Sequence, residues 1–125
     1  MKSYHIKGFI NFEGFYTGDS DDCLAIKDGD NNLVFAEFFE ENLDDKQVSI
    51  NYYISDKALS REELEEQYIK KISGLVDATI YPVYSDVTGY LWTTEECKVG
   101  GHDLFKELCS YVDKYIDMVI EVKND

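Results

Sequence analysis

The sequence predicts an α+β fold, a mainly antiparallel sheet of about five or six strands with two or three helices packed on it. Segments in which polar and apolar residues alternate are interspersed with segments of helical periodicity, and no strict strand–helix–strand repeat links them. The length of 125 residues fits one domain spanning residues 1–125. The 44% hydrophobic content, including 14% aromatics, is enough for a core.

The N-terminal part predicts a strand, two loops and a helix. Residues 2–12 alternate, with Tyr4, Ile6, Ile10 and Phe12 on one face. Residues 15–17 fit a short returning strand, and the Asp- and Gly-rich stretches 18–22 and 28–32 predict loops. Residues 32–43 fit either a strand or a helix. We expect a helix, because residues 30–32 offer caps and residues 40–42 are poor strand formers.

Residues 48–74 predict a strand followed by a helix. Val48, Ile50, Tyr52 and Ile54 alternate within residues 48–55. Ser60 and Glu63 fit a capping box that opens a helix over residues 60–74, and Gly74 fits its C-terminal stop.

The C-terminal part predicts three strands and one helix. Residues 77–85 and 89–96 fit two strands, and Pro82 places the first at an edge or a bulge. Residues 104–115 have an apolar helical face, and residues 116–122 alternate as a final strand.

Charge restricts the class of partner. The chain has 26 acidic and 12 basic residues, a formal net charge of −14. It lacks the basic surface that nucleic acid or an anionic membrane requires, and we expect it to attract basic surfaces of proteins or ribonucleoproteins. The start shows no signal peptide, no stretch is long enough to span a membrane, and the three cysteines suit reduced thiols. We therefore expect a cytoplasmic protein.

One segment concentrates the negative charge. Ten acidic residues and a single lysine, Lys27, lie between Asp19 and Asp45, with aromatic residues nearby. A row of carboxylates with aromatic anchors fits a basic groove that otherwise holds nucleic acid. The predicted partner-binding residues are Asp19, Asp21, Asp22, Asp28, Asp30, Glu37, Glu40, Glu41, Asp44 and Asp45.

The stretch CKVGGHDLFKEL, residues 97–108, allows two interpretations. The first, which we favour, is a tight glycine turn followed by a capped helix. In the second, the helix start holds an anion such as a small nucleotide, although the glycines match neither the dinucleotide fingerprint nor the phosphate loop. The residues of this alternative site are Tyr90, Trp92, Lys98, Gly100, Gly101 and His102.

No pattern in the sequence supports an enzyme, a metal or a cofactor. A calcium loop beginning at Asp28 would need glycine and glutamate where Leu33 and Phe39 stand. Cys97 and His102 could form a nucleophile and its base, but no third group orients the histidine. No paired cysteines support a zinc site. We therefore expect no catalytic residues and no metal ligands.

The C-terminal third resembles small proteins of unknown function encoded by phages and mobile elements of low-GC bacteria. The resemblance is carried by Thr88-Gly89-Tyr90-Leu91-Trp92, Gly100-Gly101-His102-Asp103-Leu104, and Leu108, Ser110, Tyr111, Lys114 and Tyr115. In those proteins a glycine often precedes the lysine, whereas Asp113 stands there in this chain. The family supplies no activity, but short acidic phage proteins are often inhibitors of host machinery, anti-CRISPR proteins among them.

Charge and resemblance together predict a non-enzymatic, phage-encoded inhibitor that binds a basic nucleic-acid-binding surface of a bacterial defence complex. One alternative is a module that sequesters a signalling nucleotide at the Gly100-Gly101-His102 segment. Another is an immunity protein, or partner, of a basic toxin.

Overall fold

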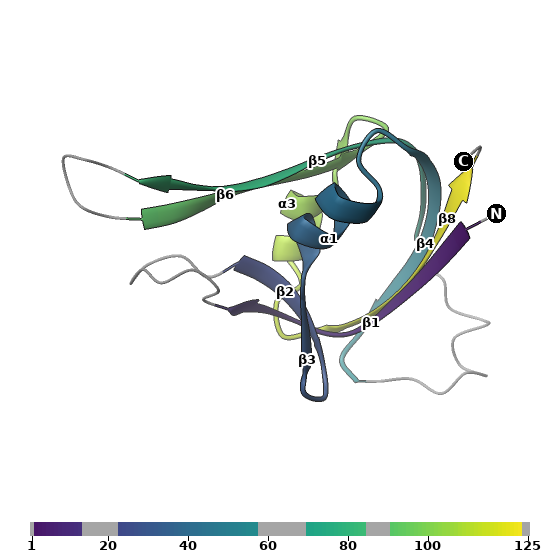
Figure 1. The fold of residues 1–125 in the computed structure, drawn as a ribbon. Helices are drawn as coiled ribbons and strands as arrows, with labels where there is room; N and C mark the ends of the chain where they lie inside the picture. Colours follow the sequence, from purple (N-terminus) through teal and green to yellow (C-terminus); the bar gives the residue numbers. More distant parts are fainter. Residues whose placement is uncertain (1, 14–22, 58–69, 85–90, 124–125) are drawn as a thin grey trace.

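The computed structural model describes residues 2–13, 23–57, 70–84 and 91–123, and in this part it contains eight strands and two helices (Figure 1). The strands are β1 (Lys2–Glu13), β2 (Cys23–Asp28), β3 (Asn31–Val34), β4 (Gln47–Ser55), β5 (Lys70–Tyr84), β6 (Leu91–Val99), β7 (His102–Asp103) and β8 (Tyr115–Lys123). The helices are α1 (Phe35–Asn42) and α3 (Leu104–Cys109).

All eight strands form one antiparallel sheet in the order β3-β2-β1-β8-β4-β5-β6-β7. The predicted α+β class and the antiparallel sheet are confirmed, but the sheet has more strands than expected. It curls strongly, so that β5 and β6 lie on one side of the helices and β2 and β3 on the other (Figure 1). Both helices occupy the hollow of the sheet.

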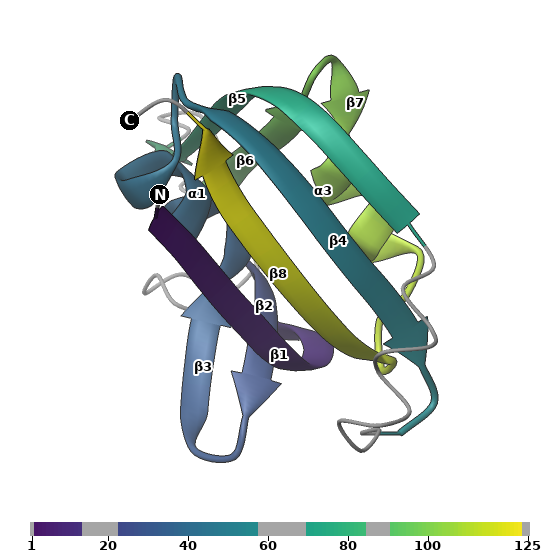
Figure 2. The ribbon, with the colours of Figure 1, turned by 90° about the vertical axis from the view of Figure 1, so that its right-hand side faces the viewer.

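The core fills the space between the concave face of the sheet and the helices. The alternation of the central strands explains it, because residues at every second position point into the hollow. Figure 2 shows β1, β8 and β4 side by side in the middle of the sheet. Their buried core residues are Ile6, Ile10, Val48, Ile50, Tyr52, Ile116, Met118, Ile120 and Val122, all at most 6% exposed. The buried faces predicted for the strands that became β1, β4 and β8 are confirmed for these residues. Tyr4 and Ile54 are only partly buried against the core, and Phe12 is 40% exposed.

Two glycines produce the curl. β1 changes its pairing partner from β8 to β2 at Phe9, next to Gly8, and β5 changes from β4 to β6 after Leu75, next to Gly74. Gly8 has a φ of 147° and Gly74 a φ of 148°, which L-residues with a side chain rarely adopt. We call these positions the two corners of the sheet.

The predicted helix over residues 60–74 is wrong at its C-terminal end. Residues 70–74 belong to β5, and Gly74 forms a corner of the sheet, so it does not stop a helix there. Cross-strand packing of residues such as Ile72, which pairs with Ile50, prevails over the helical spacing. Residues 58–69, with the proposed capping box, lie outside the described residues.

Three other boundaries differ from expectation. Residues 23–28 form β2, a strand that the sequence did not predict. Of the loop expected over residues 28–32, only residues 29–30 form the hairpin turn between β2 and β3. Residues 32–43 divide between the end of β3 and helix α1. The C-terminal helix ends at Cys109, and Tyr115 already pairs in β8. Of the strands predicted over residues 77–85 and 89–96, the described parts, residues 77–84 and 91–96, are confirmed. Pro82 lies in the part of β5 that pairs with β6 alone. Residues 15–17 lie outside the described residues.

The turn between α3 and β8 places Asp113 in the left-handed region, with a φ of 74°. Glycine adopts this conformation without the steric cost that a side chain carries. We therefore expect Asp113→Gly to raise the free energy of unfolding by about 0.5 kcal/mol. Urea denaturation of the two proteins measures the difference. A loss of stability would mean that the Asp113 side chain contributes more than its backbone conformation costs.

Candidate partner-binding site

Helix α1 has an apolar face toward the core and an acidic face on its opposite side. Phe35, Ala36 and Phe39 point into the core and are fully buried, and the Phe35 and Phe39 rings lie 4.7 Å apart. Glu37, Glu40 and Glu41 occupy the other side of the helix, where Glu40 and Glu41 are exposed. The helix is amphipathic, and burial of its aromatic face holds it in the hollow of the sheet.

Two of the predicted partner-binding carboxylates have a structural role. The amide of Ile80 donates to Glu40 at 2.6 Å, and the amide of Ala78 donates to Asp44 at 3.0 Å. These amides lie on the side of β5 that β4 no longer covers, because β4 pairs only as far as Leu75. Glu40 and Asp44 therefore satisfy backbone donors of β5 and attach α1 to the sheet. The sequence offered no signal for this role, since the two acids look like the neighbouring ones.

Three other predicted acids, Asp28, Glu37 and Glu41, line a groove that consists of two clefts. A cleft of about 410 Å³ lies between β1 and the β2–β3 hairpin and includes Asp28. A second cleft of about 280 Å³ continues along α1 and includes Glu37 and Glu41. The two clefts share Asn32, Leu33 and Phe38, so they form one surface, which we call the acidic groove.

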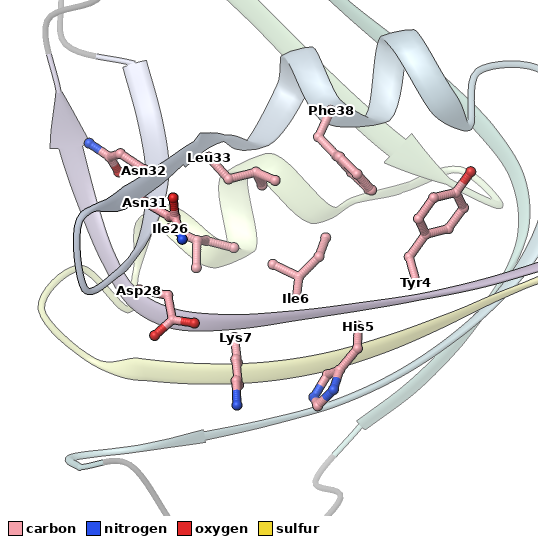
Figure 3. A pocket seen from close by; sticks show the side chains of 10 residues that line it. All are labelled: Tyr4, His5, Ile6, Lys7, Ile26, Asp28, Asn31, Asn32, Leu33 and Phe38. Carbon is pink, nitrogen blue, oxygen red and sulfur yellow. The ribbon is translucent and has the colours of Figure 1, made fainter.

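The acidic groove has an apolar floor and a charged rim. Figure 3 shows Tyr4 and Ile6 pointing from β1 toward α1, and Phe38 pointing back toward them. The Tyr4 and Phe38 rings meet edge to face, with centroids 5.3 Å apart. Asp28 lines the larger cleft together with His5 and Lys7, and Glu37 and Glu41 line the smaller cleft, where no described lining residue is basic. This combination suits a ligand that carries apolar groups and places its basic groups near the carboxylates.

The structure divides the predicted acidic residues into four groups. Asp28, Glu37 and Glu41 meet at the groove, and Asp30 lies in the exposed turn at its end. Glu40 and Asp44 bind β5, and Asp45 is exposed beyond the end of α1. Asp19, Asp21 and Asp22 lie outside the described residues.

The Gly100-Gly101 pair forms a tight turn between β6 and β7. Their φ angles of 58° and 84° are both positive, which suits a two-residue hairpin turn, and Val99 pairs with His102 across it. The Asp103 carboxylate then accepts from the amide of Lys106 at 3.0 Å and caps α3. The geometry agrees with the turn-and-cap interpretation.

The alternative nucleotide site gains no support from this arrangement. The Asp103 carboxylate occupies the start of α3, where the alternative needs a bound anion. His102 contacts Glu107 at 2.9 Å, and Lys98 is exposed on β6. Trp92 is described only through its backbone in β6, and Tyr90 lies outside the described residues.

Glu107 joins three elements beneath this turn. The Tyr52 hydroxyl of β4 donates to it at 2.5 Å, His102 of β7 lies 2.9 Å away, and Lys70 of β5 forms an ion pair with it. The side chain of Glu107 is only 12% exposed, and that of Tyr52 is buried. A neighbouring cleft of about 320 Å³ is lined by Tyr52, Lys70, Tyr111 and Lys114, among others. Lys70 forms an ion pair with Glu107, and Lys114 forms one with Asp56. The positive charge of each lysine in this cleft is therefore already balanced by a carboxylate.

The raised pKa of Tyr52 predicts that the protein loses stability in alkaline solution. Burial, with a smaller contribution from Tyr111, raises the pKa of Tyr52 to about 12, from an ordinary value near 10. Between these values the unfolded chain releases the phenolic proton and the folded chain keeps it, so stability falls as pH rises from about 10 to 12. We expect Tyr52→Phe to be less stable at neutral pH but to show a shallower loss over this window. Urea denaturation between pH 8 and 12 measures the two slopes, and parallel slopes would contradict the assignment.

The surroundings of Cys97 and Cys109 disfavour their thiolate forms. Cys97 is fully buried, and burial, followed by Asp103 and Asp77, raises its pKa well above the ordinary value. Burial together with Glu95 and Asp103 also raises the pKa of Cys109. Raised thiol pKa values oppose thiolate formation at neutral pH. Among the described residues, no three His, Cys, Asp or Glu side chains gather where a metal ion could bind.

Comparisons with known proteins found no similar protein. No family model matches the chain, and neither the curated proteins nor the solved structures contain a match. Within the described part of the chain, neither helix has the length and apolar character needed to cross a membrane.

Proposed function

We propose that the protein is a non-enzymatic inhibitor that binds a basic, nucleic-acid-binding surface of a bacterial defence complex, in the manner of an anti-CRISPR protein. The observation that carries the proposal is the acidic groove, in which Asp28 lines one cleft, Glu37 and Glu41 line the other, and Leu33 and Phe38 form an apolar floor common to both. The resemblance of the C-terminal third to phage-encoded proteins supports the bacterial defence context.

Charge complementarity explains how such a surface would act. Residues 28–45 include seven acidic residues and no lysine or arginine. A surface of this sign accelerates encounter with a basic groove and competes with nucleic acid for it. Leu33 and Phe38 would then supply the desolvated contacts that give affinity, since exposed charges alone contribute little.

The fixed position of α1 also favours recognition. Glu40 in α1 and Asp44 just beyond its end accept hydrogen bonds from β5, so Glu37 and Glu41 are presented from a helix that is hydrogen-bonded to the sheet. Binding to these two carboxylates therefore costs less conformational entropy than ordering a mobile acidic tail would.

A salt series with a charge-matched control tests the proposal. The triple variant Asp28→Asn, Glu37→Gln, Glu41→Gln removes three charges from the groove. The control Asp77→Asn, Glu96→Gln, Glu121→Gln removes three charges from exposed positions on other strands. Purified CRISPR effector complexes and basic nucleases serve as candidate targets, and titration calorimetry from 50 to 300 mM salt gives the affinities.

We expect wild-type binding that weakens with salt and blocks nucleic-acid access to the target. The groove variant should lose at least about tenfold in affinity, and the control should lose about threefold or less. Equal losses in both variants would show that only net charge matters. Binding that leaves nucleic-acid access unchanged would contradict inhibition by competition, and a basic toxin as the sole target would favour the immunity-protein alternative.

A further inference from the structure

Part of β1 has a strand on one side only. β8 pairs with residues Lys2–Phe9, but β2 pairs only with Phe9–Glu13. Between Lys2 and Lys7, no strand of the described chain lies on the side away from β8. In an antiparallel ladder alternate residues turn their N–H and C=O groups toward one neighbour, and the residues between them face the other side. This stretch therefore presents main-chain donors and acceptors at its outer edge.

The bend at Gly8 opens this edge. A Cβ atom at Gly8 would lie 2.4 Å from the carbonyl oxygen of Lys27, so a side chain there would collide with β2. β1 passes close to β2 at this point and then departs from it, while the β2–β3 hairpin turns back at Gly29 and Asp30. The space between the two is the larger cleft of the acidic groove.

The corresponding edge of β5 is covered, which makes the edge of β1 unusual. Beyond the other corner, Glu40 and Asp44 accept from the amides of Ile80 and Ala78, and the Lys46 carbonyl accepts from the amide of Val76 at 2.9 Å. Among the described residues, no such hydrogen bond reaches the outer edge of Lys2–Lys7. Proteins commonly cover or disrupt open strand edges, because they invite another strand to pair.

The groove follows the main chain of this edge. Four consecutive residues of β1, Tyr4 to Lys7, line it. Figure 3 shows Tyr4 and Ile6 on one face of the strand and His5 and Lys7 on the other. A cleft that touches both faces of a strand must run along its backbone edge. Its opposite wall consists of residues 31–33 and Phe38.

We propose that the groove receives an extended segment of the partner protein, which pairs with Lys2–Lys7 as an added strand. The identity of the partner rests on the proposed function, but the mode of binding does not. Main-chain hydrogen bonds to β1 supply affinity in such complexes, and alternate side chains supply specificity. On the face toward α1, apolar side chains of the segment would meet Leu33 and Phe38, and a basic side chain near one end of that face would meet Glu37 and Glu41. A basic side chain near the other end would meet Asp28.

Charge favours this partner over a second copy of the chain. A second copy of the chain carries the same formal net charge of −14, so two copies repel each other. A basic segment from another protein meets the three carboxylates of the groove rim, whereas a second copy brings its own excess of negative charge.

Alternately methylated peptides test strand addition directly. The probe is an eight-residue peptide of alternating valine and threonine with one lysine at each end, blocked at both ends. Two further versions carry backbone N-methyl groups on the odd or on the even residues. Methylation removes main-chain donors but leaves every side chain and charge in place. Binding is measured by titration of the isotope-labelled protein in nuclear magnetic resonance, with hydrogen exchange of the amides in Lys2–Lys7.

We expect the unmethylated peptide to bind and to protect alternate amides within Lys2–Lys7. One methylated version should bind at least about tenfold more weakly, because its blocked amides face β1, and the other should bind within about threefold. Leu33→Lys should abolish binding, whereas Leu75→Lys, at a residue 47% exposed outside the groove, should preserve it. Equal affinities of both methylated versions, or no protection of β1, would overturn strand addition.

The outcomes separate this inference from the proposed function. If the peptide does not bind while a basic effector still binds in a salt-dependent manner, strand addition is wrong and the proposed function stands. If the peptide pairs with β1 but no basic effector binds, the reverse holds. Sedimentation that shows a dimer in wild type and a monomer in Leu33→Lys would assign the groove to a second copy and overturn the proposal.

Discussion

Replacing Gly74 by alanine is expected to lower the free energy of unfolding by about 3 kcal/mol or more. A Cβ atom at this corner would lie 2.4 Å from the Cα atom of Gly100 and 2.7 Å from its nitrogen. Both contacts are with backbone, so no side chain can rotate away to relieve them. The φ of 148° adds strain that any side chain would carry. Urea denaturation followed by circular dichroism measures the loss.

Gly101→Ala provides the matched control. Gly101 also has a positive φ, 84°, but a Cβ atom there would meet nothing within 4 Å. Its substitution should therefore cost only the backbone strain, about 1 kcal/mol. The difference between the two variants isolates the contact between β5 and the Gly100-Gly101 turn. Equal losses would mean that backbone strain alone explains the requirement for glycine at Gly74.

Glu107→Ala is expected to destabilise the protein by about 2–4 kcal/mol. The largest contribution comes from Tyr52, whose buried hydroxyl would lose its carboxylate acceptor. The ion pair with Lys70 and the hydrogen bond with His102 contribute less, because the side chains of Lys70 and His102 are 47% and 43% exposed and water screens them. Thermal and urea denaturation give the size of the loss.

Two further variants identify which contact matters. Glu107→Gln keeps an acceptor for the Tyr52 hydroxyl but removes the charge, so it should cost about half as much as alanine. In the double variant Tyr52→Phe with Glu107→Ala, the loss should be smaller than the sum of the single losses, because the hydrogen bond is broken only once. Additive losses would show that Glu107 acts independently of Tyr52.

The sequence predicted the central strands because their alternation is strong. Tyr4 and Ile6, or Ile116 and Met118, occupy every second position, and only a strand buries such a pattern on one face. The pattern failed where tertiary pairing decided the structure. Residues 70–74 continue a helical spacing, yet the pairing of Ile72 with Ile50 places them in β5. Gly74 is ambiguous in the sequence, since a helix stop and a sheet corner both require glycine.

For the candidate site, only its acidic composition could be predicted from the sequence, and not which acidic residues form it. The concentration of acids between Asp28 and Asp45 indicated a charged surface, and the structure brings Asp28, Glu37 and Glu41 together at one groove. The use of Glu40 and Asp44 as acceptors for β5 depends on a separation of 34 to 40 residues along the chain, which no local pattern encodes. The open edge of β1 is equally non-local, because it follows from where β2 stops pairing.

The position of β8 has a consequence for biosynthesis. β8 lies between β1 and β4, with His5 2.7 Å from Asp117 across 112 residues of sequence. It follows the other seven strands along the chain, so β1 and β4 have no neighbour to join them until β8 has left the ribosome. Contacts so distant in sequence also make folding slow. Until β8 is made, β1 can pair only with β2 and β4 only with β5, so the edges of both strands that later contact β8 stay open. The yield of the protein in the cell should therefore depend on chaperones that bind such segments.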